Sequence, residues 1–226
     1  MNAEKFEASS DIYLKSLQCP LCQKSFKEPS VRSSSLRIDK KDSDFFIYYK
    51  GINPYFYDVW QCSCCGYTAL KADFLDLKEH QKESILRKIT TKWNARTYNL
   101  PYNAETAIER YKLALVNAVA MGSKSSTKAM LLLKIAWMHR LTASPLEEHF
   151  LKEALTTFKI AYNSEDTPFY GMDEHTLKYL IGELHRRLDY KDEALKWFGE
   201  VITCYTAPQK IKDLARDQRD KIKNIY

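Results

Sequence analysis

Apolar and polar residues follow two different periods along this chain, and the change of period lies near residue 70. From Leu70 onward, small and apolar residues recur every three or four positions, which is the period of an amphipathic helix. Three stretches repeat one arrangement, in which an aromatic residue lies between two small or branched residues: Ala107, Tyr111 and Ala114; Ala154, Phe158 and Ala161; Ala194, Phe198 and Val201. Positions i, i+4 and i+7 share one helix face, so each stretch is predicted to pack closely against a neighbouring helix.

The first 70 residues instead favour short strands, with many aromatic and β-branched residues. In the aromatic-rich stretch 45–60, a turn at Gly51 or Pro54 separates two predicted strands, Phe46–Tyr49 and Tyr57–Gln61. Asp42 and Asp44 precede the first of these strands. Two acids at this spacing could coordinate a cation, but a turn is the favoured interpretation.

The two patterns predict an α+β protein that is mainly α. Residues 1–70 are expected to form a small zinc-ribbon-like β head with a long insert between its cysteine pairs. Residues 71–226 are expected to form an α-helical repeat domain that ends in a polar-faced capping helix. No Gly/Ser-rich linker separates the two parts, so the head is predicted to pack on the helical domain.

The head also contains most of the cysteines, in a pattern typical of a metal site. "CPLC" supplies Cys19 and Cys22, and "CSCC" supplies Cys62 and Cys65, each as a Cys-x-x-Cys pair. Two such turns can offer four thiolates to one tetrahedral Zn²⁺ ion. The following Gly66 suits a turn in which the residue after the second cysteine adopts a positive φ. The predicted cofactor is therefore zinc.

Two further cysteines and one histidine lie outside this set. Cys64 is adjacent to Cys65, so both could bind one ion only with strain, and Cys64 is interpreted as a bystander. Cys204 lies on a predicted helix and is interpreted as a small buried hydrophobic residue. His80 is a less favoured substitute ligand.

The aromatic residues of the head have two interpretations. The favoured one is a small core, because a metal site alone buries too little surface to hold a domain of this size. The alternative is a platform on which bases stack, flanked by basic side chains. Its possible ligand or nucleic-acid contacts are Arg32, Arg37, Lys40, Lys41, Tyr49, Tyr57 and Trp60.

Charge and composition narrow the class of protein. Hydrophobic residues make up 45% of the chain, and the net charge of +6 is spread over both halves, without the concentrated basic stripe of a nucleic-acid binder. No apolar run is long enough to cross a membrane, and the first residues lack the apolar core of a secretory peptide. We therefore expect a cytoplasmic location, where cysteines stay reduced and available to a metal.

Two resemblances follow from these motifs. The helical stretches resemble the tetratricopeptide repeat, which stacks helical hairpins into a solenoid. "CPLCQKSF", "QCSCCGYTA" and the helices that follow resemble the bacterial family called domain of unknown function 2225, from which the chain departs at Cys64. This second resemblance covers the head and extends over the chain. It implies a zinc site at the four paired cysteines and a bacterial source, and it implies no particular activity.

The favoured function is a non-catalytic, zinc-stabilised interaction or scaffold module, with a helical surface for a protein or peptide partner. The alternative is nucleic-acid or nucleotide binding through the basic, aromatic head. An enzyme is not expected, because a closed four-thiolate site leaves no coordination position for water. His139 and His185 are interpreted as packing residues, and the sequence contains no Ser-His-Asp set or glycine-rich phosphate loop.

Overall fold

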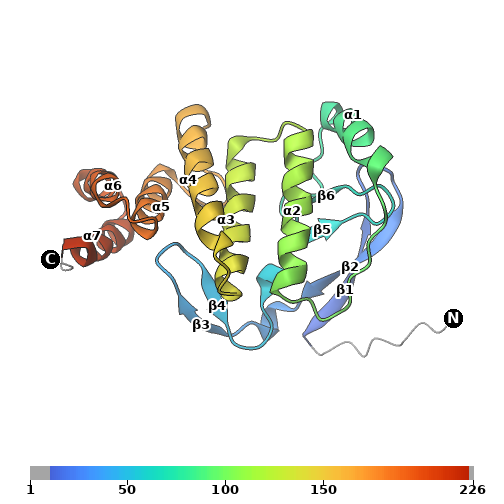
Figure 1. Ribbon diagram of the computed structural model, residues 1–226, viewed down its shortest axis with the longest axis horizontal. Coiled ribbons are helices and arrows are strands. Elements are labelled where there is room, and N and C mark those ends of the chain that lie inside the picture. The colour runs from blue at the N-terminus through green and yellow to red at the C-terminus, as the bar shows by residue number, and fades with distance from the viewer. Residues whose placement is uncertain (1–10, 224–226) are drawn as a thin grey trace. The chain divides into compact units, whose positions relative to one another are not determined.

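The computed structural model describes residues 11–223, in which six short strands precede seven α-helices (Figure 1). The strands are β1 Ile12–Gln18, β2 Ser25–Val31, β3 Ile38–Lys41, β4 Ile47–Tyr49, β5 Val59–Gln61 and β6 Thr68–Leu70. The helices are α1 Glu79–Lys88, α2 Ala104–Ala120, α3 Ser125–Leu141, α4 Leu146–Ser164, α5 Glu174–Arg187, α6 Lys191–Thr203 and α7 Gln209–Lys223. The predicted fold class, α+β and mainly α, is confirmed.

The strands form three two-stranded sheets. β1 and β2 are antiparallel with Ile12 opposite Val31, and β5 and β6 are antiparallel with Val59 opposite Leu70. β3 pairs with β4. Such small sheets cannot bury a core alone, so their stability must come from whatever packs against them.

Both strands predicted in the aromatic-rich stretch exist, but the second is shorter than expected. It begins at Val59, because residues Pro54–Tyr57 form a 3₁₀ helix instead. Pro54 fixes the φ angle of the first helical position, and the Asn53 side chain accepts a hydrogen bond from the backbone N–H of Tyr55. A local cap therefore overrides the strand preference of the aromatic residues.

The described chain divides into two compact units. The head unit contains the residues up to Lys40, then Ile47–Ser123 and Trp137–Ser144. The helical unit contains Lys41–Phe46, Lys124–Ala136 and the residues from Pro145 onward. The division does not follow the boundary at residue 70 that the sequence predicted, because α1 and α2 belong to the head unit. Within that unit α2 lies against β5 and β6 (Figure 1).

The repeated helix faces are buried as predicted. All nine residues of the three small–aromatic–small stretches are at most 1% exposed. In the helical unit, α5, α6 and α7 share a core that includes Tyr179, Phe198 and Ile222. A Cβ atom at Gly182 of α5 would lie 2.9 Å from the Phe198 ring, so the small residue allows the two helices to approach. The predicted packing face is confirmed, while the likeness to tetratricopeptide repeats stays a prediction.

The tip of the β3–β4 hairpin, Lys41–Phe46, lies against α5 within the helical unit. The Phe45 backbone N–H donates to the Asp42 carbonyl at 3.1 Å, which confirms the turn expected for this acidic stretch. The Tyr179 hydroxyl donates to the Ser43 carbonyl at 2.8 Å, and Arg187 Nη2 lies 3.4 Å from the buried Asp44 carboxylate. The buried carboxylate of Asp44 therefore forms an ion pair with Arg187.

Candidate metal centre

Two turns of the same backbone geometry carry the paired cysteines. In the first cysteine turn, Cys19–Lys24, the Cys19 N–H donates to the Lys24 carbonyl at 3.0 Å, and the Gln23 N–H donates to the Cys19 carbonyl at 2.9 Å. In the second cysteine turn, Cys62–Tyr67, the corresponding bonds measure 2.8 Å and 2.9 Å. The first turn follows directly after β1, and the second connects β5 to β6. The β1–β2 sheet and the β5–β6 sheet therefore each present one pair of thiols.

The residue after the second cysteine has a positive φ in both turns. Gly66 has φ +77°, as its sequence position suggested, and Gln23 has φ 60°. The strain at Gln23 is offset locally, since its side-chain Nε2 donates to the Pro20 carbonyl at 3.1 Å. Sequence reasoning did not find this second position, because glutamine carries no indication of a left-handed conformation.

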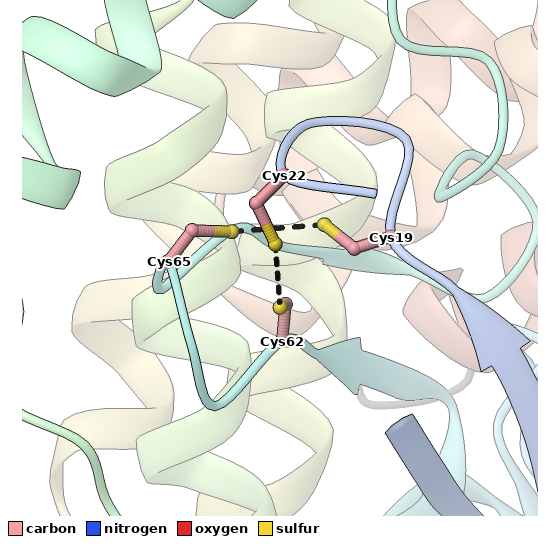
Figure 2. A group of neighbouring side chains, drawn as sticks. All are labelled: Cys19, Cys22, Cys62 and Cys65. Atoms are coloured by element: carbon pink, nitrogen blue, oxygen red, sulfur yellow. Dashed lines mark hydrogen bonds between the residues drawn. The ribbon is translucent and has the colours of Figure 1, made fainter. Parts of the chain in front are cut away.

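The four thiols converge on one point (Figure 2). The sulfur atoms of Cys19 and Cys65 are 3.6 Å apart, as are those of Cys22 and Cys62, and all four lie within 4.8 Å of one another. A tetrahedral ion with Zn–S bonds of about 2.3 Å would hold its sulfur ligands about 3.8 Å apart. The arrangement therefore fits a single four-coordinate metal ion, with ligands at the positions that the sequence predicted.

Burial and close approach make the four thiols suited to holding a cation. Cys19, Cys62 and Cys65 are buried and Cys22 is half-buried. Hydrogen bonds with the Cys62 and Cys65 thiols hold the pKa of Cys19 well below its usual range, and hydrogen bonds with Cys19 and Cys62, together with burial, raise the pKa of Cys65. Thiols this close share protons, and a divalent cation can replace those protons as the positive charge.

The other candidate ligands lie outside this group. Cys64 is exposed, in keeping with its interpretation as a bystander, and His80 is exposed on α1. Cys204 is half-buried and forms the C-cap after α6, where its sulfur lies 3.3 Å from the Thr206 hydroxyl. The prediction that Cys204 is a buried residue within a helix was wrong, because α6 ends at Thr203.

A segment after α1 covers the second cysteine turn. Trp93 Nε1 donates to the Ser63 carbonyl at 2.8 Å, and the Thr90 hydroxyl donates to the Cys65 carbonyl at 2.9 Å. A Cβ atom at Gly66 would lie 2.5 Å from the Trp93 ring, so glycine is needed there for space as well as for φ. Contacts across this many residues leave no local pattern, and the sequence did not reveal them.

The aromatic rings nearest the metal centre form a core. Trp60 packs with Leu17, Tyr67, Phe74 and Ile85 around the cysteines and is 3% exposed. Burial of Trp60 confirms the favoured interpretation, that the rings build a small core.

Tyr57 is also 3% exposed, and it stacks on Tyr102 with ring centroids 5.0 Å apart. Trp60 and Tyr57 therefore cannot form a base-stacking surface, and their assignment as possible nucleic-acid contacts was wrong.

The remaining proposed contacts each engage a different neighbour. Tyr49 is half-buried with its ring edge toward Tyr55, at 6.0 Å. The basic residues are exposed, and their partners are as follows: Arg32 lies over the Tyr13 ring, Arg37 donates to the Ser34 carbonyl, Lys40 lies over the Tyr48 ring and Lys41 lies over the Phe45 ring. These contacts do not gather the predicted residues into one binding platform.

A buried polar network lies next to the second cysteine turn, and sequence reasoning missed it. Arg110 of α2 donates through Nη2 to the Glu28 carboxylate at 2.9 Å and to the Val59 carbonyl at 2.7 Å. The other Glu28 oxygen accepts from the backbone N–H of Gln61 at 3.0 Å. Burial raises the pKa of Glu28 although Arg110 acts to lower it. Glu28 and Arg110 are far apart in sequence, so only the fold reveals the pair.

Within residues 11–223, no helix combines the length and the apolar character that a membrane-spanning segment requires.

Comparison with known proteins identifies the family. A family model described as "Uncharacterized protein conserved in bacteria (DUF2225)" matches residues 12–222, nearly the whole chain. A search of curated proteins and a search of solved structures found no match. The chain belongs to the bacterial DUF2225 family, as its cysteine motifs and helical pattern suggested.

Proposed function

We propose that this member of the DUF2225 family is a non-catalytic interaction module of the cytoplasm. In this proposal a structural Zn²⁺ ion stabilises the head unit, and the helical unit binds a protein or peptide partner. The observation that carries the proposal is the convergence of Cys19, Cys22, Cys62 and Cys65 within 4.8 Å.

The donor set favours zinc as the ion. Four thiolates in a tetrahedron suit Zn²⁺ or iron, and they exclude the hard cations that prefer oxygen ligands. Zinc sites of this kind contribute directly to folding, because the ion joins elements that are otherwise separate. Here the ion would join the first cysteine turn to the second, and thus the β1–β2 sheet to the β5–β6 sheet.

The same donor set supports a non-catalytic role. Catalytic zinc keeps a coordination position for water or substrate, whereas four protein thiolates fill the tetrahedron. Among the described residues, these four cysteines are the single cluster of at least three metal-ligating side chains. An ion held there would act on folding, because protein thiolates would fill its coordination sphere.

The helical unit supplies the surface that a partner could use. Its helices bury small and aromatic residues inside, while Ile160 of α4 is 52% exposed and Tyr205, between α6 and α7, is 96% exposed. Aromatic residues are enriched in protein–protein interfaces, where a large ring buries much surface at a small cost in entropy. These exposed residues support an interaction role, which the fold class alone does not establish.

The zinc proposal is tested by metal analysis of two matched variants. We expect one zinc ion per chain in the wild-type protein, measured by elemental mass spectrometry. Cys19→Ser should lose the ion and the native near-UV circular dichroism of the head, because three thiolates hold zinc far more weakly than four. Cys64→Ser removes an exposed thiol from the second cysteine turn, and this variant should keep both the ion and the circular dichroism. A metal-free wild-type protein with an intact head would contradict the proposal.

The partner proposal needs a different variant. Tyr205→Ser should reduce the recovery of a specific co-purifying protein from the source bacterium, because it removes the most exposed aromatic ring of the described residues. Leu14→Ser in the head unit serves as the control, because it removes another exposed apolar side chain. This control variant should not reduce the recovery of the partner. Equal recovery with wild-type protein and both variants would contradict a role for this surface.

A further inference from the structure

The head unit contains a cavity of about 410 Å³, a volume typical of sites for small molecules. It is lined by parts of β2, by Gln61 and Ser63 of the second cysteine turn region, by the segment before α2, and by Arg110 of α2. All these residues belong to one compact unit, so their arrangement is that of a single folded body. The metal centre and its stated function make no use of this cavity.

The floor of the cavity holds a buried hydrogen-bond donor without a partner. Gln61 is 5% exposed, and its side-chain Oε1 lies 3.4 Å from Arg110 Nη1. The Nε2 of the same amide is shielded from water and has no partner among the described residues. Buried polar groups almost always have partners, so this donor indicates that an acceptor is missing.

The network next to Gln61 determines which end of its amide has a partner. Arg110 is held by its hydrogen bonds to Glu28 and to the Val59 carbonyl. Its Nη1 faces Gln61 Oε1, so the Nε2 of Gln61 is the end of the amide without a partner. The terminal torsion of glutamine is soft, so the amide can turn toward an acceptor that enters the cavity.

Charge and ring surfaces define what could enter. Arg110 is paired with Glu28 and Arg96 with Glu109, so Lys27 is the lining cation without a carboxylate partner among the described residues. Lys27 is exposed at the rim, and Arg96 keeps partial exposure beside its partner Glu109. The half-buried ring of Tyr98 adds a flat apolar wall. An excess of positive charge beside a ring favours an anion that carries a planar group.

We propose that this cavity binds a small organic anion with a planar ring. An oxygen of the anion accepts a hydrogen bond from Gln61 Nε2, its charge faces Lys27 and Arg96, and its ring lies against Tyr98. Aromatic carboxylates and mononucleotides share this chemistry. Because Gln61 directly precedes Cys62, such a ligand would bind beside the metal centre without contacting the metal.

The test uses the full-length, metal-loaded protein with AMP, benzoate and inorganic phosphate as probes. The side-chain amide resonances of Gln61 are followed by NMR during each titration. We expect a saturable shift with AMP or with benzoate, and the probe that gives it distinguishes a nucleotide from a carboxylate. Phosphate lacks a ring and should bind at least about tenfold more weakly. No saturable shift with either ring-bearing probe, or equal binding of phosphate, would overturn the proposal.

Three variants make the assignment specific. Gln61→Met has nearly the same shape but no donor, and it should weaken binding by about tenfold or more. Lys27→Gln should weaken binding by a smaller factor, whereas Lys50→Gln removes an equal charge outside the lining and should leave binding unchanged. Wild-type affinity in Gln61→Met would overturn the assigned contact, and so would an equal loss in Lys50→Gln. Metal content is measured in parallel, so failure of the zinc proposal is recognised separately.

Discussion

The two compact units of this protein are built on different kinds of core. In the head unit, cysteines, aromatic rings and short two-stranded sheets surround a cluster of four thiols. In the helical unit, small residues on one helix admit aromatic rings from the next, as Gly182 admits Phe198. The first core is arranged around a group of thiols that could hold a metal ion, whereas the second combines apolar packing with ion pairs such as that of Asp44 with Arg187. Substitutions that remove a thiol or a charge should therefore affect mainly the head unit. Substitutions that change side-chain volume should affect mainly the helical unit.

Among substitutions outside the metal centre, the largest expected effect lies in the polar network of the head. Arg110→Met removes the partner of the buried Glu28, and breaking a buried pair costs about 3–5 kcal/mol of unfolding free energy. The double variant Arg110→Met with Glu28→Gln removes both charges, and the amide oxygen can still accept from the Gln61 backbone N–H. We expect the double variant to recover much of the loss in denaturant unfolding. Equal stability of the two variants would contradict a buried ion pair.

The head unit offers a comparison of two glycines with positive φ, one of them in the second cysteine turn. Gly66→Ala meets both backbone strain and the Trp93 ring, and it should cost about 2–4 kcal/mol. Gly51→Ala has a similar φ and nothing within 4 Å of the added Cβ, so it should cost only about 1–2 kcal/mol. Thermal unfolding and zinc retention measure the difference. If Gly66→Ala cost no more than Gly51→Ala, the account of Trp93 as a cover would be wrong.

The helical unit offers a second pair of glycines, with effects of opposite sign. Gly182→Ala places a methyl group 2.9 Å from Phe198 and should destabilise the unit by about 1–2 kcal/mol. Gly199→Ala, on α6, meets nothing within 4 Å and should stabilise the helix by about 0.5–1 kcal/mol. Neither substitution should change zinc content. Destabilisation by both variants would show that the helices do not approach as described.

A smaller effect on stability is expected when the pH is lowered. Burial lowers the pKa of His185, whose Nδ1 lies 2.8 Å from the Ile181 carbonyl. The unfolded chain therefore binds the proton more readily, so this contribution to stability is complete above the ordinary histidine pKa of about 6.5 and is lost as the pH falls through the lowered value.

His185→Gln should reduce that dependence in the helical unit, and the stacked Trp197 provides a fluorescence readout. An unchanged pH profile in the variant would contradict the assignment of His185.

The features that sequence predicted are those that depend on local spacing. The Cys-x-x-Cys pairs placed all four thiols correctly, and the small–aromatic–small pattern identified buried helix faces such as that of Phe158. Each of these inferences needs only neighbouring residues in a known type of element. The turn at Asp42 was found for the same reason.

The features that were missed depend on contacts between distant segments. Trp60 and Tyr57 have the composition of a stacking surface, but α1 and the Tyr102 segment bury them. The pairing of Arg110 with Glu28 and the cover of Gly66 by Trp93 join segments that only the fold brings together. Burial is a property of tertiary packing, so composition alone could not decide between a core and a binding surface.

Hydrogen exchange measured by mass spectrometry, with and without a zinc chelator, tests the central claim most directly. The account predicts that removal of the ion abolishes amide protection in the two cysteine turns and in β5 and β6, while α5, α6 and α7 keep most of theirs. Restoring zinc should restore the protection of the head unit. Unchanged protection in the cysteine turns after complete removal of the metal would contradict the claim that a structural ion holds the head together.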